Sequence, residues 1–262
     1  MKFDRSACIE TLYTEIDFYD RIEAASNDGF KYIEFWSRDD KDIDKITELT
    51  KKHNIKVASF NGDADLSLVD PNQKKEYLEY LKKSVEIAKK LDSVAVTIHS
   101  NGLGDGGVVI NDYAHLSDTV KICTMYDTLK ECAKISEESG IRMNLEMLNI
   151  TTDHVGNYLA TTRMAAELTE MVGSEYIKIL YDVYHMQLNE GSICDNISKY
   201  IDQIGHVHVA DVPGRHEPGT GEINYHNVYK HLEKCGYEGI VGYELYPQSS
   251  TEKAVEAIFQ KS

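Results

Sequence analysis

The sequence is poor in cysteine and contains no long apolar run. Its five cysteines form no CxxC pair and their number is odd, which predicts buried free thiols in a reducing compartment. No stretch approaches the roughly 18 apolar residues that a membrane span needs, and the charged start MKFDRSACIE lacks the apolar core of a signal peptide. We therefore expect a cytoplasmic protein with no membrane partner.

Basic residues are also scarce, with 28 Lys and Arg against 44 Asp and Glu and a formal net charge of -16. The densest basic pairs fall on amphipathic patterns and are interpreted as solvated helix faces: Lys51-Lys52, Lys74-Lys75, Lys82-Lys83 and Lys89-Lys90. An acidic chain without a local basic patch is poorly suited to hold a nucleic-acid backbone or to bind an anionic membrane. The composition therefore predicts a small-molecule partner and no nucleic acid.

The sequence has no low-complexity segment and no linker that would divide it, and strand-like and helix-like patterns alternate from end to end. The expected strands are 2–10, 31–35, 55–60, 93–99, 142–147, 177–182, 206–210 and 240–244. The expected helices are 15–27, 39–53, a long one after 70–71, 117–139, 157–172, 183–204 with a break near 190–191, 224–235, and one from 251 onward. The long helix after 70–71 has its buried stripe at Tyr77, Leu81, Val85 and Ala88. Eight strand–helix pairs predict an α/β fold, a single (β/α)8 TIM barrel over residues 1–262, with an open doubly wound sheet as the alternative.

Four of the expected strands end in a side chain that can bind a metal ion. These are Glu146, Asp182, His208 and Glu244, and each spacing between them leaves room for one helix and its loops. Because the active site of a barrel forms at the C-terminal ends of its strands, the four side chains are expected to converge. Three carboxylates and one imidazole suit one divalent cation, Mn²⁺ first, with Mg²⁺, Co²⁺ or Zn²⁺ as alternatives.

Three other strands end in polar side chains, Glu34, Asn61 and His99. Any one of them alone is typical of a helix cap or a loop contact, but together they predict a polar mouth. Asn61 and His99 are therefore candidates for substrate binding, although a buried, hydrogen-bonded core histidine is an equally good reading of His99. His185, about one helical turn past Asp182, is a further candidate, with a solvent-exposed helix position as the alternative.

Strand alternation places some residues one layer below the four candidate ligands. Residues two apart in a strand share a face, so Asn144 lies below Glu146 and His206 lies below His208. By the same argument Gly242 should leave empty space below Glu244. His154, eight residues past Glu146, is a weaker candidate for the lining of the mouth.

The polar loop 211–225 is the longest turn-rich segment of the chain. Its Pro-Gly pairs at 213–214 and 218–219 predict a stiff loop that holds Arg215 and Glu217 near the substrate. An arginine there can donate two hydrogen bonds to a carboxylate or to neighbouring oxygens. Neither this loop nor the glycine-rich run 101–107 carries a phosphate-binding ending, so we expect no organic cofactor.

Four motifs resemble the hydroxypyruvate isomerase family: NLEMLN at 144–149, YDVYHMQLNEG at 181–191, IGHVHVADVPGRHEPGTGEINY at 204–225 and GYELYP at 242–247. That family belongs to the xylose-isomerase-like TIM barrels, which include ketose 3-epimerases and the catalytic subunits of C-glycoside deglycosidases. The resemblance implies that Glu146, Asp182, His208 and Glu244 bind the metal and that Glu146 and Glu244 also move the proton. It further implies that His185 and Arg215 contact substrate oxygens.

The chain departs from this family at two positions. Members that act on hydroxypyruvate typically carry Gln where this chain has His208, and Arg where it has Ile150. The expected activity is therefore a metal-dependent isomerase or epimerase of a sugar or hydroxy-keto acid. A C-glycoside deglycosidase subunit acting on 3-keto-glycosides is the alternative. The first implies a homo-oligomer and the second a small partner subunit. A nuclease at abasic DNA and a non-catalytic sugar-binding barrel are the alternatives from other classes.

Overall fold

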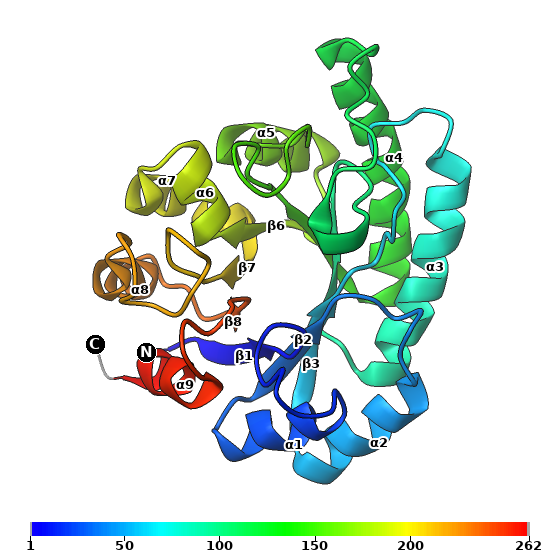
Figure 1. Ribbon diagram of the computed structural model, residues 1–262. Coiled ribbons are helices and arrows are strands. Elements are labelled where there is room, and N and C mark those ends of the chain that lie inside the picture. The colour runs from blue at the N-terminus through cyan, green and yellow to red at the C-terminus, as the bar shows by residue number, and fades with distance from the viewer. Residues whose placement is uncertain (1, 261–262) are drawn as a thin grey trace.

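Eight parallel strands form one sheet around a central axis, with helices outside it (Figure 1). The computed structural model describes residues 2–260. The strands are β1 Asp4–Cys8, β2 Tyr32–Phe35, β3 Lys56–Phe60, β4 Ala95–Ile98, β5 Arg142–Glu146, β6 Ile177–Asp182, β7 Ile204–His208 and β8 Ile240–Tyr243. Each strand is followed by at least one helix before the next strand begins.

The sheet closes on itself between β3 and β4. The paired strands run in the order β3-β2-β1-β8-β7-β6-β5-β4, and the remaining gap is bridged by backbone hydrogen bonds. Gly62 N–H donates to Thr97 O at 2.7 Å, and Val94 N–H donates to Val57 O at 3.2 Å. The predicted TIM barrel is therefore confirmed, and the open doubly wound sheet is wrong.

The outer layer consists of nine α-helices and two short 3-10 segments within residues 2–260. They are α1 Asp20–Asn27, α2 Ile43–His53, α3 Lys74–Leu91, η1 Asp105–Gly107, α4 Asp118–Ser139, α5 Thr162–Val172, α6 Val183–Asn189, α7 Ile193–Tyr200, η2 Ile201–Gln203, α8 Tyr225–Lys234 and α9 Thr251–Phe259. Local chemistry sets many of their ends. Ser117 and Thr161 accept backbone N–H groups at the starts of α4 and α5, and Gly140 and Gly173 end those helices in the left-handed conformation.

Three helices begin later than predicted, and one of them is α2, which starts at Ile43 rather than at Asp39. Residues 15–19 form turns, so α1 begins at Asp20 rather than at Glu15. Residues 157–161 also precede their helix, because Ser100 and Asn101 bind them through side-chain hydrogen bonds. The break predicted near 190–191 separates α6 from α7.

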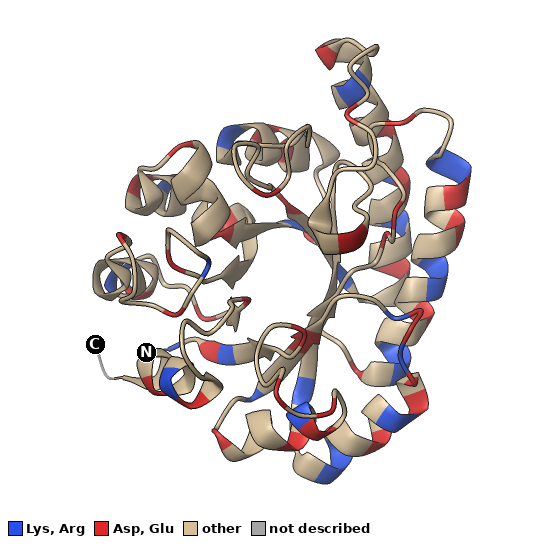
Figure 2. Cartoon of the chain, in the orientation of Figure 1, with Lys and Arg blue, Asp and Glu red and all other residues tan. Residues whose placement is uncertain are grey.

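The charges lie mainly on the outside of the barrel. Figure 2 shows Lys and Arg interspersed with Asp and Glu along the outer helices. Inside, His206 and His208 share one face of β7, as strand alternation predicted, since both contact the carboxylate of Glu34. Among residues 2–260, no helix combines the length and apolarity that crossing a membrane requires.

Candidate active site

The four predicted metal ligands meet at the C-terminal ends of β5 to β8. Glu146, Asp182 and His208 end their strands, and Glu244 follows β8 directly. One ligand atom from each lies within 4.8 Å of those of the others. All four side chains are almost fully buried. His208 Nδ1 lies 3.3 Å from Glu244 Oε2 and 3.9 Å from Glu146 Oε1. The structure thus brings together the set that the strand ends predicted.

This group fits a divalent cation on the chemistry of its own atoms. His208 Nδ1 is buried and has no hydrogen-bond partner within the described part of the chain. Buried polar atoms of this kind are rare unless a water, ion or ligand satisfies them. Carboxylate oxygens with one imidazole nitrogen are ligands that Mn²⁺, Mg²⁺, Co²⁺ and Zn²⁺ accept. The role of the four residues as ligands remains a prediction.

The Arg215 guanidinium lies between two carboxylates of the predicted ligand set, those of Asp182 and Glu244. Its Nη2 is 2.6 Å from Glu244 Oε2 and 3.5 Å from Asp182 Oδ2. Burial would raise the pKa of Glu244, but Arg215 and His208 outweigh it and hold that pKa well below its usual range. Burial dominates at Asp182 and raises its pKa to about 6, although Arg215 and His208 oppose the shift. Arg215 is therefore placed to balance negative charge at the site.

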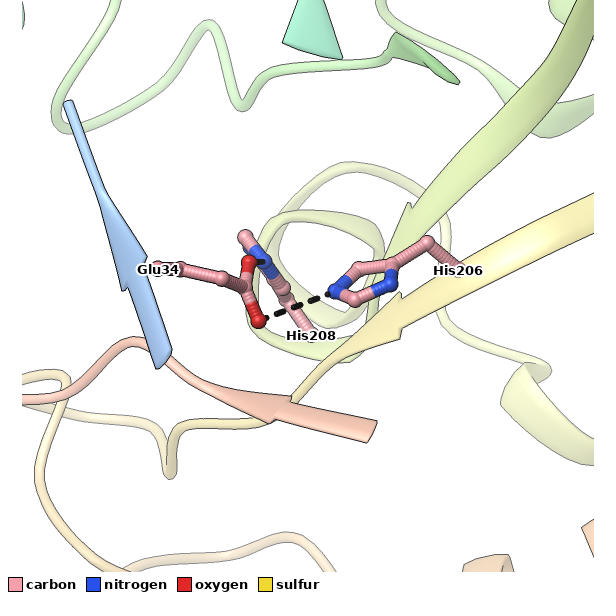
Figure 3. A group of neighbouring side chains, drawn as sticks. All are labelled: Glu34, His206 and His208. Atoms are coloured by element: carbon pink, nitrogen blue, oxygen red, sulfur yellow. Dashed lines mark hydrogen bonds and ion pairs between the residues drawn. The ribbon is translucent and has the colours of Figure 1, made fainter. Parts of the chain in front are cut away.

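A buried carboxylate supports His208 from below (Figure 3). Glu34, from β2, reaches across to β7, where its Oε2 is 2.7 Å from His208 Nε2 and its Oε1 is 3.2 Å from His206 Nε2. These two histidines hold the pKa of Glu34 below its usual range against the opposing effect of burial. Because Nε2 of His208 faces Glu34, its Nδ1 faces the metal-ligand group, an arrangement common in metal sites.

The predicted empty space below Glu244 is absent. A Cβ atom added to Gly242 would overlap Glu34 Oε1 and would lie 2.7 Å from His208 Cδ2 and 3.0 Å from His206 Nε2. The glycine is required because the Glu34 carboxylate and the two imidazoles fill that layer. The expectation of a void was wrong because strand alternation within β8 says nothing about side chains that arrive from other strands, here β2 and β7.

His99 connects Glu146 to a second buried carboxylate. Its Nε2 is 3.2 Å from Glu146 Oε2, and its Nδ1 is 3.3 Å from Asp63 Oδ1. Burial lowers the pKa of His99, but the two carboxylates outweigh it and raise the pKa to about 10. His99 is thus buried and hydrogen-bonded, as one sequence reading expected, and it also lies at the site. Asp63, in the loop after β3, carried no sequence pattern that would have identified it.

His185 and His154 lie side by side in the same cavity, with ring centroids 5.1 Å apart. Burial, followed by nearby positive charge, lowers the pKa of His185 well below the usual range. Burial also lowers the pKa of His154. Both imidazoles are therefore neutral at neutral pH. The alternative of an exposed His185 is wrong, since its side chain is 1% exposed.

A cavity of about 730 Å³ opens at this end of the barrel. Asn61, His99, His185 and Arg215 line it, as the sequence predicted. Glu217 is not among the described lining residues, because its carboxylate accepts a hydrogen bond from Gln248 N at 2.9 Å and holds the loop. The structure therefore does not place Glu217 on the wall of this cavity, and its contact with substrate stays a prediction.

Trp36 is a lining residue that the sequence reasoning missed. It is the sole tryptophan of the chain and follows β2 directly. Its Nε1–H donates a 2.5 Å hydrogen bond to Glu244 Oε1. Its position just past a strand end is the available indication, but an indole is not a metal ligand.

Comparisons with known proteins agree with this geometry. A family model described as xylose isomerase-like TIM barrel matches residues 22–261. Hydroxypyruvate isomerase of Escherichia coli (strain K12) is 31% identical over 255 residues, covering 94% of this chain and 95% of that protein. The 2-oxo-tetronate isomerase of Haemophilus influenzae is 28% identical over 264 residues, covering 98% of each. The crystal structure of AP endonuclease, family 2, from Brucella melitensis matches with a TM-score of 0.87 and 26% identity, covering 98% of this chain and 99% of that one. The chain therefore belongs to the xylose isomerase-like TIM barrel family and is a homologue of hydroxypyruvate isomerase.

Proposed function

We propose that this protein is a divalent-metal-dependent isomerase or epimerase of a sugar or hydroxy-keto acid. The observation that carries the proposal is the convergence of Glu146 and Glu244 with Asp182 and His208 in one buried group. The relatives named hydroxypyruvate isomerase and 2-oxo-tetronate isomerase support the same class of reaction. Such reactions remove a proton from a carbon beside a carbonyl and return it. They require a side chain of the protein that can act as acid and base within reach of that carbon.

Glu146 and Glu244 occupy different environments, which suit different steps of the reaction, the removal of a proton from the substrate and its return. A cation held by Glu146, Asp182, His208 and Glu244 would stabilise the negative charge that develops on an enediolate. Glu146 Oε1 has no partner, whereas both oxygens of Glu244 are engaged, by Trp36 and by Arg215. Glu146 is therefore the group proposed to remove the proton.

The proton is then returned to the substrate, so the overall reaction is balanced without any other reactant. Glu146, as a carboxylic acid, delivers the proton to the neighbouring carbon and becomes a carboxylate again. Delivery to the opposite face of the same carbon requires Glu244 to begin the turnover as the carboxylic acid, and the proton held by Glu146 then passes to Glu244 before the next turnover. Return to the neighbouring carbon gives an isomer, and return to the opposite face gives an epimer. Arg215 Nη2, near both Glu244 and Asp182, is placed to donate to a substrate oxygen.

A second candidate is the catalytic subunit of a C-glycoside deglycosidase, which removes a proton beside the ketone of a 3-keto-glycoside. Two features of the cavity favour a substrate larger and less charged than hydroxypyruvate. Its volume of about 730 Å³ lies in the range of sites for drug-sized ligands. Asp39, Asp65 and Asp105 also line it, whereas Arg215 is the one Lys or Arg among the described lining residues.

The other classes of function are less well supported. A nuclease at abasic DNA needs a basic groove, but the chain carries a net charge of -16 and its outer helices mix both signs (Figure 2). A sugar-binding barrel without activity would have no need for a buried base, and Glu146 is present with a free oxygen.

The test is solvent exchange in D2O with Mn²⁺-loaded protein and a panel of ketoses, hydroxypyruvate and 3-keto-glycosides. We expect deuterium to enter at the carbon beside the carbonyl in one class of substrate, because proton removal precedes return. Product formation separates isomerisation, epimerisation and deglycosylation. Absence of exchange across the panel, with metal bound, would overturn the proposal and favour a binding protein.

Trp36 provides a direct reading of metal binding. Because its indole donates to Glu244, a change at Glu244 should change the emission of this sole tryptophan. We expect titration of chelator-treated protein with Mn²⁺ to quench Trp36 fluorescence with a stoichiometry of about one ion, as a single group of four ligands implies. Inductively coupled plasma analysis gives the ion count independently. A bound ion with unchanged emission would place the metal elsewhere.

A further inference from the structure

Two neighbouring imidazoles at the cavity present nitrogen atoms that have no partner. The rings of His154 and His185 meet edge to face at 74°, and both line the cavity. The Nε2 atoms of both are buried and without a hydrogen-bond partner within residues 2–260. His185 Nε2 is 3.5 Å from Asp182 Oδ2 and 3.9 Å from Glu146 Oε1, so it lies beside the predicted metal ligands. A bound molecule is the natural partner for both atoms.

Asn149 determines which nitrogen of His185 carries the proton. Asn149 Oδ1 accepts hydrogen bonds from the backbone N–H groups of Thr152 and Asp153, at 3.1 and 2.9 Å. Those two donors fix the orientation of the amide, so its Nδ2 must point the other way. There it donates to Asp153 Oδ2 at 2.7 Å and to His185 Nδ1 at 2.8 Å. Nδ1 of His185 is therefore an acceptor, and the proton of the neutral ring is on Nε2.

The backbone gives His154 the opposite form. Its Nδ1 lies 2.6 Å from the carbonyl oxygen of Gly107, which can only accept, so Nδ1 carries the proton and Nε2 has a free lone pair. Gly107 must be glycine for this contact, because its φ is +78° and a Cβ would lie 2.7 Å from His154 Cε1. The same bonds argue against a second cation at Asp153, His154 and His185, since neither nitrogen of His185 has a lone pair to offer.

We propose that Asn149 and the Gly107 carbonyl fix His185 and His154 in opposite neutral tautomers, and that the pair binds one uncharged hydroxyl group of the substrate. His185 Nε2–H donates to the hydroxyl oxygen, and His154 Nε2 accepts the hydroxyl proton. A carboxylate or phosphate oxygen does not fit, because it has no proton for His154. The assignment rests on the proposed function and sharpens it: the substrate carries a hydroxyl group beside its reacting carbons.

The tautomers can be read by NMR without any turnover. In protein labelled with 15N-histidine, long-range 1H–15N correlations distinguish protonated from bare ring nitrogens, and His185→Gln and His154→Gln assign the two rings. We expect bare Nδ1 and protonated Nε2 for His185, and the reverse for His154. A wild-type His185 with a proton on Nδ1 would overturn the proposal.

A reciprocal exchange tests whether Asn149 sets the tautomer of His185. In Asn149→Asp with Asp153→Asn, the bond between the two positions is kept with its direction reversed, but residue 149 then accepts from His185 instead of donating. We expect the proton of His185 to move from Nε2 to Nδ1. Asp153→Asn alone is the matched control and should leave the His185 pattern unchanged, because Asn149 still donates. An unchanged His185 in the double variant would overturn the role of Asn149 as a positioning residue.

The hydroxyl is tested with whichever ketose exchanges deuterium and its deoxy analogues. The double variant should lower kcat/KM about tenfold for the hydroxyl-bearing substrate, the effect of leaving one buried polar group unpaired. One deoxy analogue should show little difference between wild type and variant. Equal losses with every analogue would contradict the hydroxyl subsite. Absence of turnover would instead count against the proposed function, and the NMR result would still decide the tautomers.

Discussion

Glu146→Gln is expected to lower kcat about 10³-fold, the usual size of a lost general base, while the barrel keeps its fold. The substitution keeps the shape of the side chain and the contact of one oxygen with His99 Nε2, which is 3.2 Å from Glu146 Oε2. It removes the charge and the basicity of Oε1, which has no other partner. Deuterium exchange into substrate and the thermal unfolding midpoint measure the two halves of the prediction.

Because Glu146 is also a predicted metal ligand, its loss must be separated from loss of the ion. If the substitution only weakens Mn²⁺ binding, saturating Mn²⁺ restores activity, and Trp36 emission verifies that the site is full. If the substitution removes the base, activity stays low at full occupancy. Glu138→Gln, exposed on α4, is the matched control for the change of charge and should turn over normally. Near-normal exchange in the Glu146→Gln variant at full occupancy would contradict the assignment of this residue as the base.

Much of the fold could be predicted because the strands alternate with helices at a regular spacing. The least accurate predictions were helix starts, and the reason lies in tertiary hydrogen bonds. At 157–161 the amphipathic pattern continues, but Ser100 Oγ accepts Leu159 N–H at 3.1 Å, and Asn101 Oδ1 accepts Tyr158 N–H at 2.8 Å. These partners lie in the loop after β4, and no pattern around residue 157 records them.

The candidate site shows the same division between local and distant information. Glu146, Asp182, His208 and Glu244 were found because each ends a strand, and parallel strands end at one edge. The sequence predicted no role for the residues that hydrogen-bond to the site side chains. These pairs are Asp63 with His99, Asn149 with His185, Trp36 with Glu244 and Glu34 with His208. Each of these contacts joins residues from different strands or loops, so it depends on how the barrel closes rather than on spacing.

Glu34→Gln is expected to weaken Mn²⁺ binding about 10- to 100-fold, the usual effect of losing a residue that orients a metal-binding histidine. Glu34 Oε2 is 2.7 Å from His208 Nε2, and this contact keeps the proton on Nε2 and leaves Nδ1 free for the cation. A glutamine offers one acceptor oxygen for two histidines, and its amide group would face the other ring. The mismatch leaves a buried polar atom unpaired and should also lower the free energy of unfolding by about 1–3 kcal/mol.

The layer around Glu34 has no room to relax, which is why the effect should reach the metal. Gly242 already lies where any added atom would meet the Glu34 carboxylate and His208 Cδ2, so a displaced glutamine must push His208 toward the site. Titration of Trp36 emission with Mn²⁺ gives the affinity, with Glu48→Gln, exposed on α2, as the matched control. If Glu34→Gln lowers stability but binds Mn²⁺ as tightly as wild type, the carboxylate serves the barrel and does not orient His208. If Glu34→Gln instead binds Mn²⁺ more weakly and regains activity at saturating Mn²⁺, Glu34 supports the metal site by orienting His208.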